Sequence, residues 1–259
     1  MFRLTMALPI AVILVACASA DRPARSADRE TTVPILVYHR FGPVVADSMT
    51  VTTAAFSSQL KFLKDNGYTV IPLKQLLEYF QKGSSPPPSR SVVITVDDGH
   101  RSVYTEMLPL VRQFRIPVTL FIYPSAISNA TYALTWSQLR EMQATGLFEV
   151  ESHTYWHPNF KIEKKRLSPS EYDQFVQMQL TKSKERLEKE LGITVGLLAW
   201  PFGIHDQELI QQALGAGYTA AFTLQRRAAC RSDNPMALPR YLMTNGDIGQ
   251  KFERILSGR

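Results

Sequence analysis

Short apolar runs alternate with amphipathic stretches along most of the chain. The run at 33–39 is rich in β-branched residues and predicts a buried strand, and the apolar positions at 53–66 recur at helical spacing. Further strands are predicted at 68–71, 91–96, 117–123, 148–152, 196–200, 218–224 and 238–243, and further helices at 73–81, 103–114, 136–144, 169–191, 207–216 and 248–256. This alternation predicts a parallel sheet in a single α/β domain over residues 33–259. Seven or eight units that close on themselves would give a distorted (β/α)7–8 TIM-like barrel.

The first twenty residues have the pattern of an export signal. Arg3 is their only charge, and residues 4–16 form an apolar run too short to cross a bilayer comfortably. The segment ending at Cys17 resembles a bacterial lipobox, whereas the one ending at Ala20 matches an A-x-A cleavage site. We favour the lipobox because this cysteine has no other evident use, and it implies a periplasmic or outer-membrane-anchored bacterial lipoprotein. An uncleaved anchor is the third interpretation, and a polar tether is expected at 21–32.

Composition and charge exclude several classes of protein. Hydrophobic residues make up 45% of the chain and charged residues 20%, which excludes a disordered, collagenous or coiled-coil chain. The net charge of +6 is spread along the chain and the basic runs are interrupted, so no nucleic-acid partner is expected. Cys17 and Cys230 are too few for a disulfide scaffold, and their spacing matches no cysteine-based zinc site.

Three clusters of polar or turn-forming residues follow predicted strands. Asp97 and Asp98 precede a glycine after the third strand. His153 and His157 follow the fifth strand, and their i, i+4 spacing would place both rings on one face if this segment coils. The Trp-Pro-Phe-Gly sequence at 200–203 is typical of a rigid turn, which can direct a backbone N–H toward a developing oxyanion. Each cluster alone also fits an ordinary turn or a pair of packed histidines.

The three clusters together point to hydrolytic chemistry. The carboxyl ends of barrel strands meet at one face, so the clusters are expected to converge. There Asp98, His153 and His157 would offer a carboxylate and two imidazoles to a divalent metal and leave positions open for water. Asp97 would stay ionised beside the metal and act as a base. This set suits hydrolysis by metal-activated water.

At these motifs the sequence resembles the polysaccharide deacetylases of carbohydrate esterase family 4, over about residues 33–243. Asp97-Asp98-Gly99 is similar to the family's T-F-D-D-G motif, with valine in place of phenylalanine, and 153–157 matches its H-[ST]-x-x-H motif. Residues 200–203 are similar to the end of its R-x-P-[FYW]-G motif. The resemblance implies that Asp97 is the general base and that Asp98 and the two histidines bind the metal.

The same resemblance implies the cofactor and the products. The metal is most often zinc in this family, with Co²⁺, Ni²⁺ or Fe²⁺ as alternatives. The backbone N–H of Phe202 would help the metal to hold the tetrahedral oxyanion. The products would be acetate and a free glucosamine.

Two positions depart from the family pattern. Ala199 stands where the family has the arginine that steadies the base, and the late L-x-H motif that supplies the general acid reads Leu-Pro-Arg at 238–240. Arg240 is the candidate to replace the missing arginine from its own strand. His39, at the end of the first strand, is the first candidate for the acid and His205 is the second, although either could be a packed or surface histidine.

Further residues near the motifs are candidates for contact with substrate. Aromatic rings can stack on sugars and polar side chains can line a groove, and the candidates are Tyr155, Trp156, Pro201 and His100. The stretches at 125–135 and 158–167 are expected to be loops that form groove walls.

The leading functional hypothesis is a metal-dependent N-deacetylase that acts outside the cytosol on N-acetylglucosamine units of a polysaccharide. The first strand and the missing motif arginine make the chain similar to exported poly-N-acetylglucosamine deacetylases. Two alternatives stay open: an O-acetyl esterase on xylan or another acetylated glycan, and a weakly active glycan-binding module. The expected partners are the polysaccharide and, through the N-terminal lipid anchor alone, a membrane.

Overall fold

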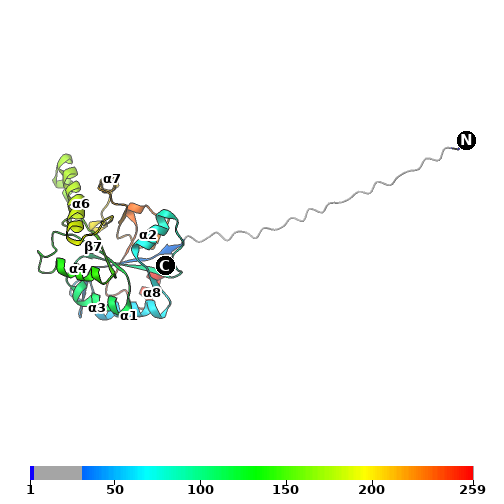
Figure 1. Ribbon diagram of the computed structural model, residues 1–259, viewed down its shortest axis with the longest axis horizontal. Helices are drawn as coiled ribbons and strands as arrows, with labels where there is room; N and C mark the ends of the chain where they lie inside the picture. The colour runs from blue at the N-terminus through cyan, green and yellow to red at the C-terminus, as the bar shows by residue number, and fades with distance from the viewer. Residues whose placement is uncertain (3–30, 259) are drawn as a thin grey trace.

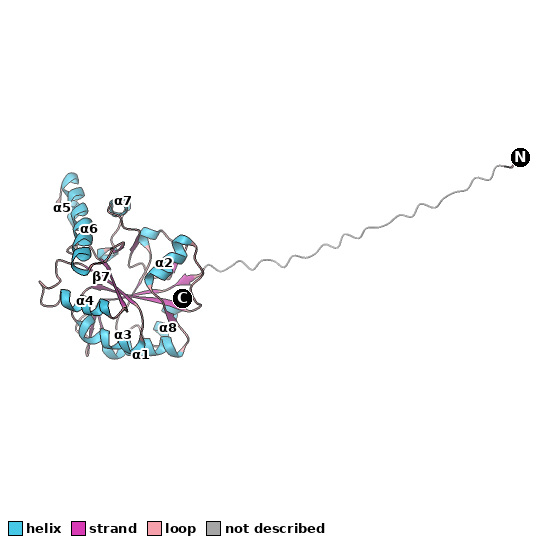
Figure 2. Cartoon of the chain, viewed as in Figure 1, coloured by secondary structure: helices cyan, strands magenta, loops and turns pink. Residues whose placement is uncertain are grey.

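Parallel strands form a strongly curled central sheet, and helices surround it (Figures 1 and 2). The computed structural model describes residues 1–2 and 31–258. Its main sheet has eight strands in the order β10-β9-β8-β7-β6-β2-β12, and β5 pairs with β6 beside this path. These strands are β2 (Ile35–Tyr38), β5 (Thr69–Val70), β6 (Ser91–Asp98), β7 (Val118–Ile122), β8 (Phe148–Ser152), β9 (Leu197–Ala199), β10 (Ala220–Phe222) and β12 (Tyr241–Leu242). Their pairings are all parallel, as the alternation of strands and helices predicts.

The sheet closes into a distorted barrel through one short segment. Leu238 donates its N–H to Ala221 in β10 and accepts the N–H of Thr223, the residue after β10, both over 2.8 Å. A few residues later, β12 pairs with β2 at the other edge of the sheet. β8 and β9 share only the residue pair Ser152–Leu198, so the barrel is least regular between these two strands. The predicted single-domain, distorted α/β barrel is therefore confirmed.

The helices cover the outside of the sheet and one of its ends. They are α1 (Thr53–Asp65), α2 (Leu73–Lys82), α3 (Leu108–Phe114), α4 (Trp136–Ala144), α5 (Phe160–Arg166), α6 (Pro169–Leu191), α7 (Gln207–Gly215) and α8 (Gln250–Leu256). The long helix α6 begins with a capping box between Ser168 and Glu171 and ends at Gly192, whose φ of 66° is left-handed. Figure 1 shows that part of α6 projects beyond the barrel.

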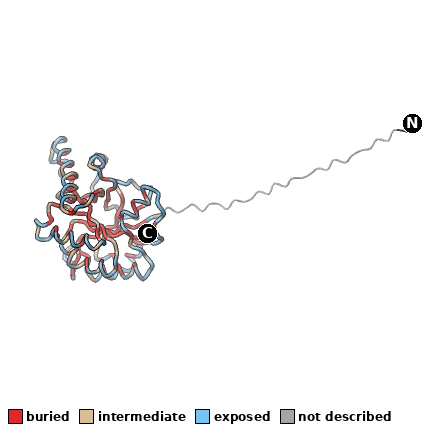
Figure 3. The backbone as a smooth tube through the Cα atoms, in the orientation of Figure 1, coloured by how far each residue is buried: buried red, intermediate tan, exposed pale blue. Residues whose placement is uncertain are grey.

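The barrel interior is apolar near the beginnings of the strands and polar near their ends. Alternate strand residues such as Ile35 and Val93 form one buried cluster with the apolar face of α2. On β6 the same face continues through Thr95 to Asp97, and both side chains are buried. Figure 3 shows buried residues gathered along the central strands. The polar end of the barrel therefore rests on a packed apolar base.

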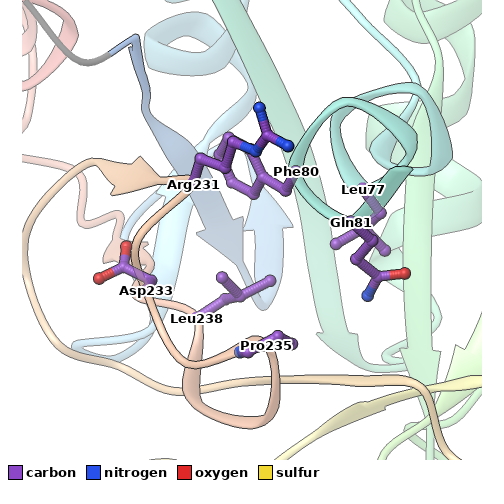
Figure 4. Close-up of a pocket in the computed structure, with 7 residues that line it drawn as sticks. All are labelled: Leu77, Phe80, Gln81, Arg231, Asp233, Pro235 and Leu238. Carbon is purple, nitrogen blue, oxygen red and sulfur yellow. The ribbon is translucent and has the colours of Figure 1, made fainter. Parts of the chain in front are cut away.

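A cavity of about 330 Å³ lies between α2 and the chain segment that leads to β12 (Figure 4). It is lined by Leu77, Phe80, Gln81, Arg231, Asp233, Pro235 and Leu238. The carboxylate of Asp233 forms an ion pair with Arg227 and accepts the Cys230 N–H, so its charge is already satisfied within the fold. The lining includes none of the predicted site residues.

The structure differs from the predicted elements in a few places. Residues 158–167, predicted as a loop, contain α5, because Asn159 caps its first turn by accepting the Ile162 N–H. The predicted helix at 103–114 begins as a π-helical turn before α3. Thr32, predicted as the end of the tether, lies in β1 (Thr32–Val33), which pairs with β11 (Ala229–Cys230). The short parallel pair of β3 (Arg40–Gly42) and β4 (Thr50–Thr52) was not predicted either.

The predicted export signal, with Cys17 and Ala20, lies outside the described residues, as does the predicted tether up to residue 30. Within residues 1–2 and 31–258, no helix combines the length and the apolar character needed to cross a membrane.

Candidate active site

Three neighbouring strands bring the aspartate and histidine motifs to one edge of the sheet. Asp97 and Asp98 end β6, and His153 directly follows β8. β7 lies between them, and its Ile122 is level with Asp98 on one side and with Ser152 on the other. Because the strands are parallel and in register, their carboxyl ends lie level and the motif side chains meet there.

Asp98, His153 and His157, called the triad below, have the composition and spacing of a metal site. The Oδ1 atom of Asp98 lies 3.5 Å from Nε2 of His153 and 3.7 Å from Nε2 of His157. One potential ligand atom from each residue lies within 4.8 Å of the other two. Asp98 Oδ1 is buried and has no hydrogen-bond partner within the described part of the chain. An unsatisfied carboxylate oxygen beside two imidazoles fits a divalent cation with further positions open to water.

The two histidines converge through a turn, and their segment does not form the helical coil that was one way to bring them together. Thr154 and His157 have left-handed φ angles of 66° and 64°, which a helix does not allow. The turn is held by the Thr154 hydroxyl, which accepts the His157 N–H over 3.2 Å. As a result the two rings meet edge to face with their centroids 4.6 Å apart. The spacing in sequence was informative, but the geometry behind it is a strained turn at the end of a strand.

Burial and one hydrogen bond prepare His153 for metal binding. Its Nδ1 lies 2.8 Å from the Ala199 carbonyl, which can only accept, so Nδ1 carries the proton. Nε2, which faces Asp98, is then left with its lone pair. Burial lowers the pKa of His153 to about 3, despite the opposing charge of Asp97, and burial also lowers the pKa of His157. Both imidazoles are therefore neutral at neutral pH, as ligation requires.

Asp97 is buried in a two-pronged ion pair with Arg240. Each carboxylate oxygen accepts one guanidinium N–H over 2.7 Å, and both residues are at most 1% exposed. Burial alone would raise the pKa of Asp97, but the charge of Arg240, together with the nearby histidines and the hydrogen bonds, lowers it to about 2. Asp97 is therefore a carboxylate throughout the neutral range.

The remaining contacts of Arg240 fix its position inside the barrel. Its Nε donates to the Thr223 carbonyl over 3.2 Å, and Nη1 also donates to the Thr95 hydroxyl over 3.3 Å. The guanidinium lies over the rings of Phe121 and Phe222, at 5.3 Å and 5.9 Å from their centroids. Arg240 thus reaches Asp97 from the segment that closes the barrel, and not from the position of Ala199.

His39 lies close to both aspartates. It is only 8% exposed, and its Nδ1 is buried without a hydrogen-bond partner within the described residues. Its charge is one of the influences that lower the pKa of Asp97 and oppose the rise in the pKa of Asp98. His205, the second candidate for the acid, is instead exposed, and its Nδ1 lies 3.1 Å from the Gly203 carbonyl. The two candidates for the acid therefore differ in environment: His39 is enclosed and His205 faces solvent.

The Pro-Phe-Gly turn forms one wall of the site. Residues Pro201–Gly203 make a single 3₁₀ turn after β9, with Pro201 buried and Phe202 in a left-handed conformation at φ 57°. This strained backbone presents the Phe202 ring, which is 56% exposed, edge-on to His157 at 4.6 Å between centroids. A β-carbon on Gly203 would lie 2.9 Å from the Leu224 backbone nitrogen, so only glycine fits there.

The predicted substrate-binding residues differ in their exposure to solvent. Trp156 is 47% exposed and rests on Phe175, with ring centroids 5.5 Å apart. Tyr155 is half-buried beneath the Lys182 ammonium group, 4.5 Å from its ring centroid. His100 is half-buried and its Nδ1 lies 2.8 Å from the Ser102 hydroxyl.

Two tyrosines at the site were missed in the sequence. Tyr123 directly follows β7, and its ring lies 5.5 Å from the His157 ring, between centroids. Its hydroxyl lies 2.9 Å from that of Tyr132, whose side chain is 43% exposed. The signal for Tyr123 was its place at the carboxyl end of a predicted strand, the end of the barrel that also carries the aspartates. Tyr132 lies within a loop, where no pattern singles it out.

Comparison with known proteins agrees with this arrangement. The family described as "Polysaccharide deacetylase" matches residues 84–221. The chain is 26% identical over 258 residues to the poly-beta-1,6-N-acetyl-D-glucosamine N-deacetylase of Staphylococcus aureus (strain MSSA476), and the match covers 93% of this chain and 88% of that protein. It is 25% identical over 289 residues to the protein of the same name from Escherichia coli (strain K12), across 93% of this chain and 43% of that one.

Solved structures share the fold at lower identity. The Streptococcus pyogenes deacetylase PplD in complex with acetate superimposes with a TM-score of 0.78 at 20% identity, over 88% of this chain and 99% of that one. IcaB from Ammonifex degensii superimposes with a TM-score of 0.76 at 23% identity, over 87% of this chain and 96% of that one. Both support the architecture of the distorted barrel.

Proposed function

The chain belongs to the polysaccharide deacetylase family, and we propose that it hydrolyses N-acetyl groups on N-acetylglucosamine units of an extracellular or cell-envelope polysaccharide. One observation carries the proposal: the triad lies beside Asp97, a buried carboxylate that Arg240 keeps ionised. The names of the relatives from S. aureus and E. coli favour a β-1,6-linked polymer as the substrate.

The triad is the proposed metal site. Zn²⁺ is the first candidate and Co²⁺, Ni²⁺ or Fe²⁺ are alternatives, since two neutral imidazoles and one carboxylate suit all of them. A bound divalent cation supplies Lewis acidity, which lowers the pKa of water and polarises the acetyl carbonyl. The unsatisfied Oδ1 of Asp98 is the proposed carboxylate ligand atom.

Asp97 is the proposed proton acceptor. Its carboxylate lies within 3.8 Å of His153 Nε2, next to the place where the attacking water would bind. Arg240 orients the carboxylate and keeps it charged, at the cost of making it a weaker base. A weak base suffices when the water is already acidified, because the proton then needs less driving force to leave.

The rest of the reaction is assigned to His39 and Phe202. Water adds its oxygen to the acetyl carbon while Asp97 accepts a proton, and the Phe202 N–H donates to the oxyanion. The C–N bond then breaks, acetate keeps the new oxygen, and the amine nitrogen takes a proton from His39. The proton that Asp97 accepted replaces it through water, so both residues end as they began. His39 is buried, it interacts electrostatically with both aspartates, and its Nδ1 has no hydrogen-bond partner among the described residues, which supports this role.

The proposed groove for the polymer runs over the carboxyl ends of the strands. Trp156 and Phe202 offer exposed aromatic surface there, while Pro201, Tyr155 and His100 support the walls. The proposed export signal at 1–20 would place this groove outside the cytosol, and a lipid on Cys17 would anchor it to a membrane. Mass spectrometry of the membrane fraction tests the anchor, and an unmodified N-terminus at Asp21 would contradict it.

Acetate release from β-1,6- and β-1,4-linked N-acetylglucosamine oligomers tests the function. The purified chain should release acetate when Zn²⁺ is added, and neither the chelated protein nor Asp97→Asn should do so. Asp233→Asn is the matched control, because Asp233 is also paired with an arginine but lies outside the site. This control should retain the wild-type rate.

Two outcomes would count against the proposal. Near wild-type turnover of Asp97→Asn with metal bound would exclude Asp97 as the base. Release of acetate from O-acetylated xylan but from neither N-acetyl oligomer would favour the esterase, and no release from any substrate would favour a glycan-binding module.

A further inference from the structure

Tyr132 presents an exposed aromatic ring beside the candidate active site. It belongs to the connection between β7 and α4, and its side chain is 43% exposed. A single exposed aromatic side chain is common on protein surfaces, so the contacts that hold this ring in place are what distinguish it. The reaction proposed above assigns no role to this residue.

The Tyr132 ring is held in one orientation from two sides. It stacks on the His100 ring with an angle of 10° between the planes and 6.2 Å between the centroids. Its hydroxyl lies 2.9 Å from the Tyr123 hydroxyl. Its backbone carbonyl accepts the Arg101 N–H over 2.7 Å, and Ala133 forms a β-bridge with His100. An exposed ring with these restraints loses little conformational entropy when a ligand packs on it.

The support beneath Tyr132 is itself anchored in the fold. His100 Nδ1 lies 2.8 Å from the Ser102 hydroxyl, and that hydroxyl accepts the Phe41 N–H over 2.9 Å. The His100 ring therefore supports Tyr132 from a fixed position.

Contacts connect this ring to the triad through one intermediary. The Tyr123 ring lies 5.5 Å from the His157 ring, between centroids, and the Tyr123 hydroxyl lies 2.9 Å from that of Tyr132. Phe202 meets the same histidine directly at 4.6 Å. Tyr132 thus reaches His157 through Tyr123, whereas Phe202 contacts this histidine directly, so Tyr132 lies beside the reacting position and not at it.

We propose that Tyr132 is a stacking platform for a sugar unit adjacent to the one being deacetylated, with His100 as the residue that positions it. The apolar C–H face of a β-linked hexosamine would pack on the exposed Tyr132 ring, as aromatic side chains pack on apolar surfaces elsewhere. The platform makes the enzyme prefer a chain of sugars over a single N-acetylated unit. This inference rests on the proposed N-deacetylase function.

Chain-length dependence tests the platform. We compare kcat/KM of the full chain, Tyr132→Ala and Tyr132→Phe on N-acetylglucosamine monomer and on a long β-1,6-linked oligomer. Tyr132→Ala should lose about threefold to tenfold on the oligomer, the range for one aromatic contact, and nothing on the monomer. Tyr132→Phe should keep most of the oligomer activity, because the ring remains. Leu214→Ala, an exposed apolar residue on α7, is the control and should change neither substrate.

Binding of the oligomer to the chelated protein, followed by calorimetry, separates this inference from the proposed reaction. Weaker binding by Tyr132→Ala supports the platform even if no acetate is released, whereas absence of acetate release by the unmodified chain counts against the function alone. An equal loss of kcat/KM on monomer and oligomer in Tyr132→Ala would contradict the proposed platform. Unchanged binding of the oligomer by this variant would contradict it as well. Loss of activity by Tyr132→Phe equal to that of Tyr132→Ala would also overturn it, since the hydroxyl would then carry the effect.

Discussion

Replacing Arg240 with methionine should leave Asp97 as an unpaired charge inside the barrel. Arg240 is 0% exposed, and its guanidinium makes both 2.7 Å hydrogen bonds to Asp97. Methionine keeps much of the apolar stem that packs near Phe121 and Phe222, so the substitution removes mainly the charge and its hydrogen bonds. The variant therefore isolates the ion pair better than a truncation to alanine would.

The size of the effect follows from the pKa of Asp97. The arginine overcomes the cost of burial and lowers this pKa from 3.8 to about 2. At ~1.4 kcal/mol for each pKa unit, the ionised form of Asp97 gains a net stabilisation of roughly 2 kcal/mol in the folded state. Arg240→Met reverses this gain and leaves the burial cost uncompensated, so we expect a loss of about 3–5 kcal/mol in the free energy of unfolding at pH 7.

The lowered pKa of Asp97 determines how its contribution to stability changes with pH. A carboxyl group whose pKa is lowered by folding stabilises the protein above its unfolded pKa, and this contribution disappears as the pH falls from about 4 to about 2. The difference in stability between the wild type and Arg240→Met should therefore be largest at neutral pH and shrink through that acidic range. In the variant, burial without Arg240 raises the pKa of Asp97, and the cost of its buried charge disappears once the pH falls below that raised pKa.

Urea unfolding of the chelated protein, with and without Asp97→Asn, measures the coupling between the two residues. In the Asp97→Asn background no buried charge is left behind, so Arg240→Met should cost at least ~2 kcal/mol less there than in the wild type. A loss below about 1 kcal/mol at pH 7, or an equal loss in both backgrounds, would refute the reasoning. Acetate release should fall in Arg240→Met even at temperatures where the variant stays folded.

Three further predictions concern the sheet, the turn and the triad. Burial raises the pKa of Glu151 from 4.5 to about 7, although its carboxylate accepts two backbone N–H groups. The free energy of unfolding should therefore fall as the pH rises from 4.5 to 7, and Glu151→Gln should remove this dependence in urea unfolding. Gly203→Ala adds a clash with the Leu224 backbone to the strain of φ 68°, whereas Gly146→Ala has similar strain at φ 72° and open space, so Gly203→Ala should lower the melting temperature more. His157→Gln should weaken Zn²⁺ binding, measured by chelator competition, by more than about a hundredfold, beyond the loss typical of outer-shell partners.

The strands and the motifs after them could be predicted because local pattern and barrel geometry determine both. The stretch at 148–152 alternates apolar and polar residues, and the observed strand β8 has the same limits. Once the strands were parallel, the meeting of Asp98 and His153 at one edge needed no further information. The sequence could not predict the left-handed φ of Thr154 and His157, because neither residue type requires that conformation.

Side chains that act across the fold were harder to predict than those that follow strands. The basic run at 161–166 was assigned to a loop, but its surface charges are compatible with a helix once Asn159 caps it and Phe160 is buried. Tyr132 has no local signal, since its position depends on contacts with Tyr123, at the other end of the same connection, and with His100, on another segment. Such contacts are set by how loops fold back over a completed sheet, which periodicity does not describe.

The arginine that contacts Asp97 stands on a different segment from the one in the family motif, yet its charge occupies the same position beside the carboxylate. At the family's arginine position, Ala199 has no side chain to offer, but its carbonyl fixes the proton on His153 Nδ1. The guanidinium reaches Asp97 from β12's side of the barrel, where the closing segment brings Arg240 within 2.7 Å of both carboxylate oxygens. Inside a closed barrel, residues on different strands point at the same volume, so a required charge can come from any of them. The site therefore requires a positive charge beside the Asp97 carboxylate, and not an arginine at one position in the sequence. A motif search that expects the arginine before the Pro-Phe-Gly turn would miss this site.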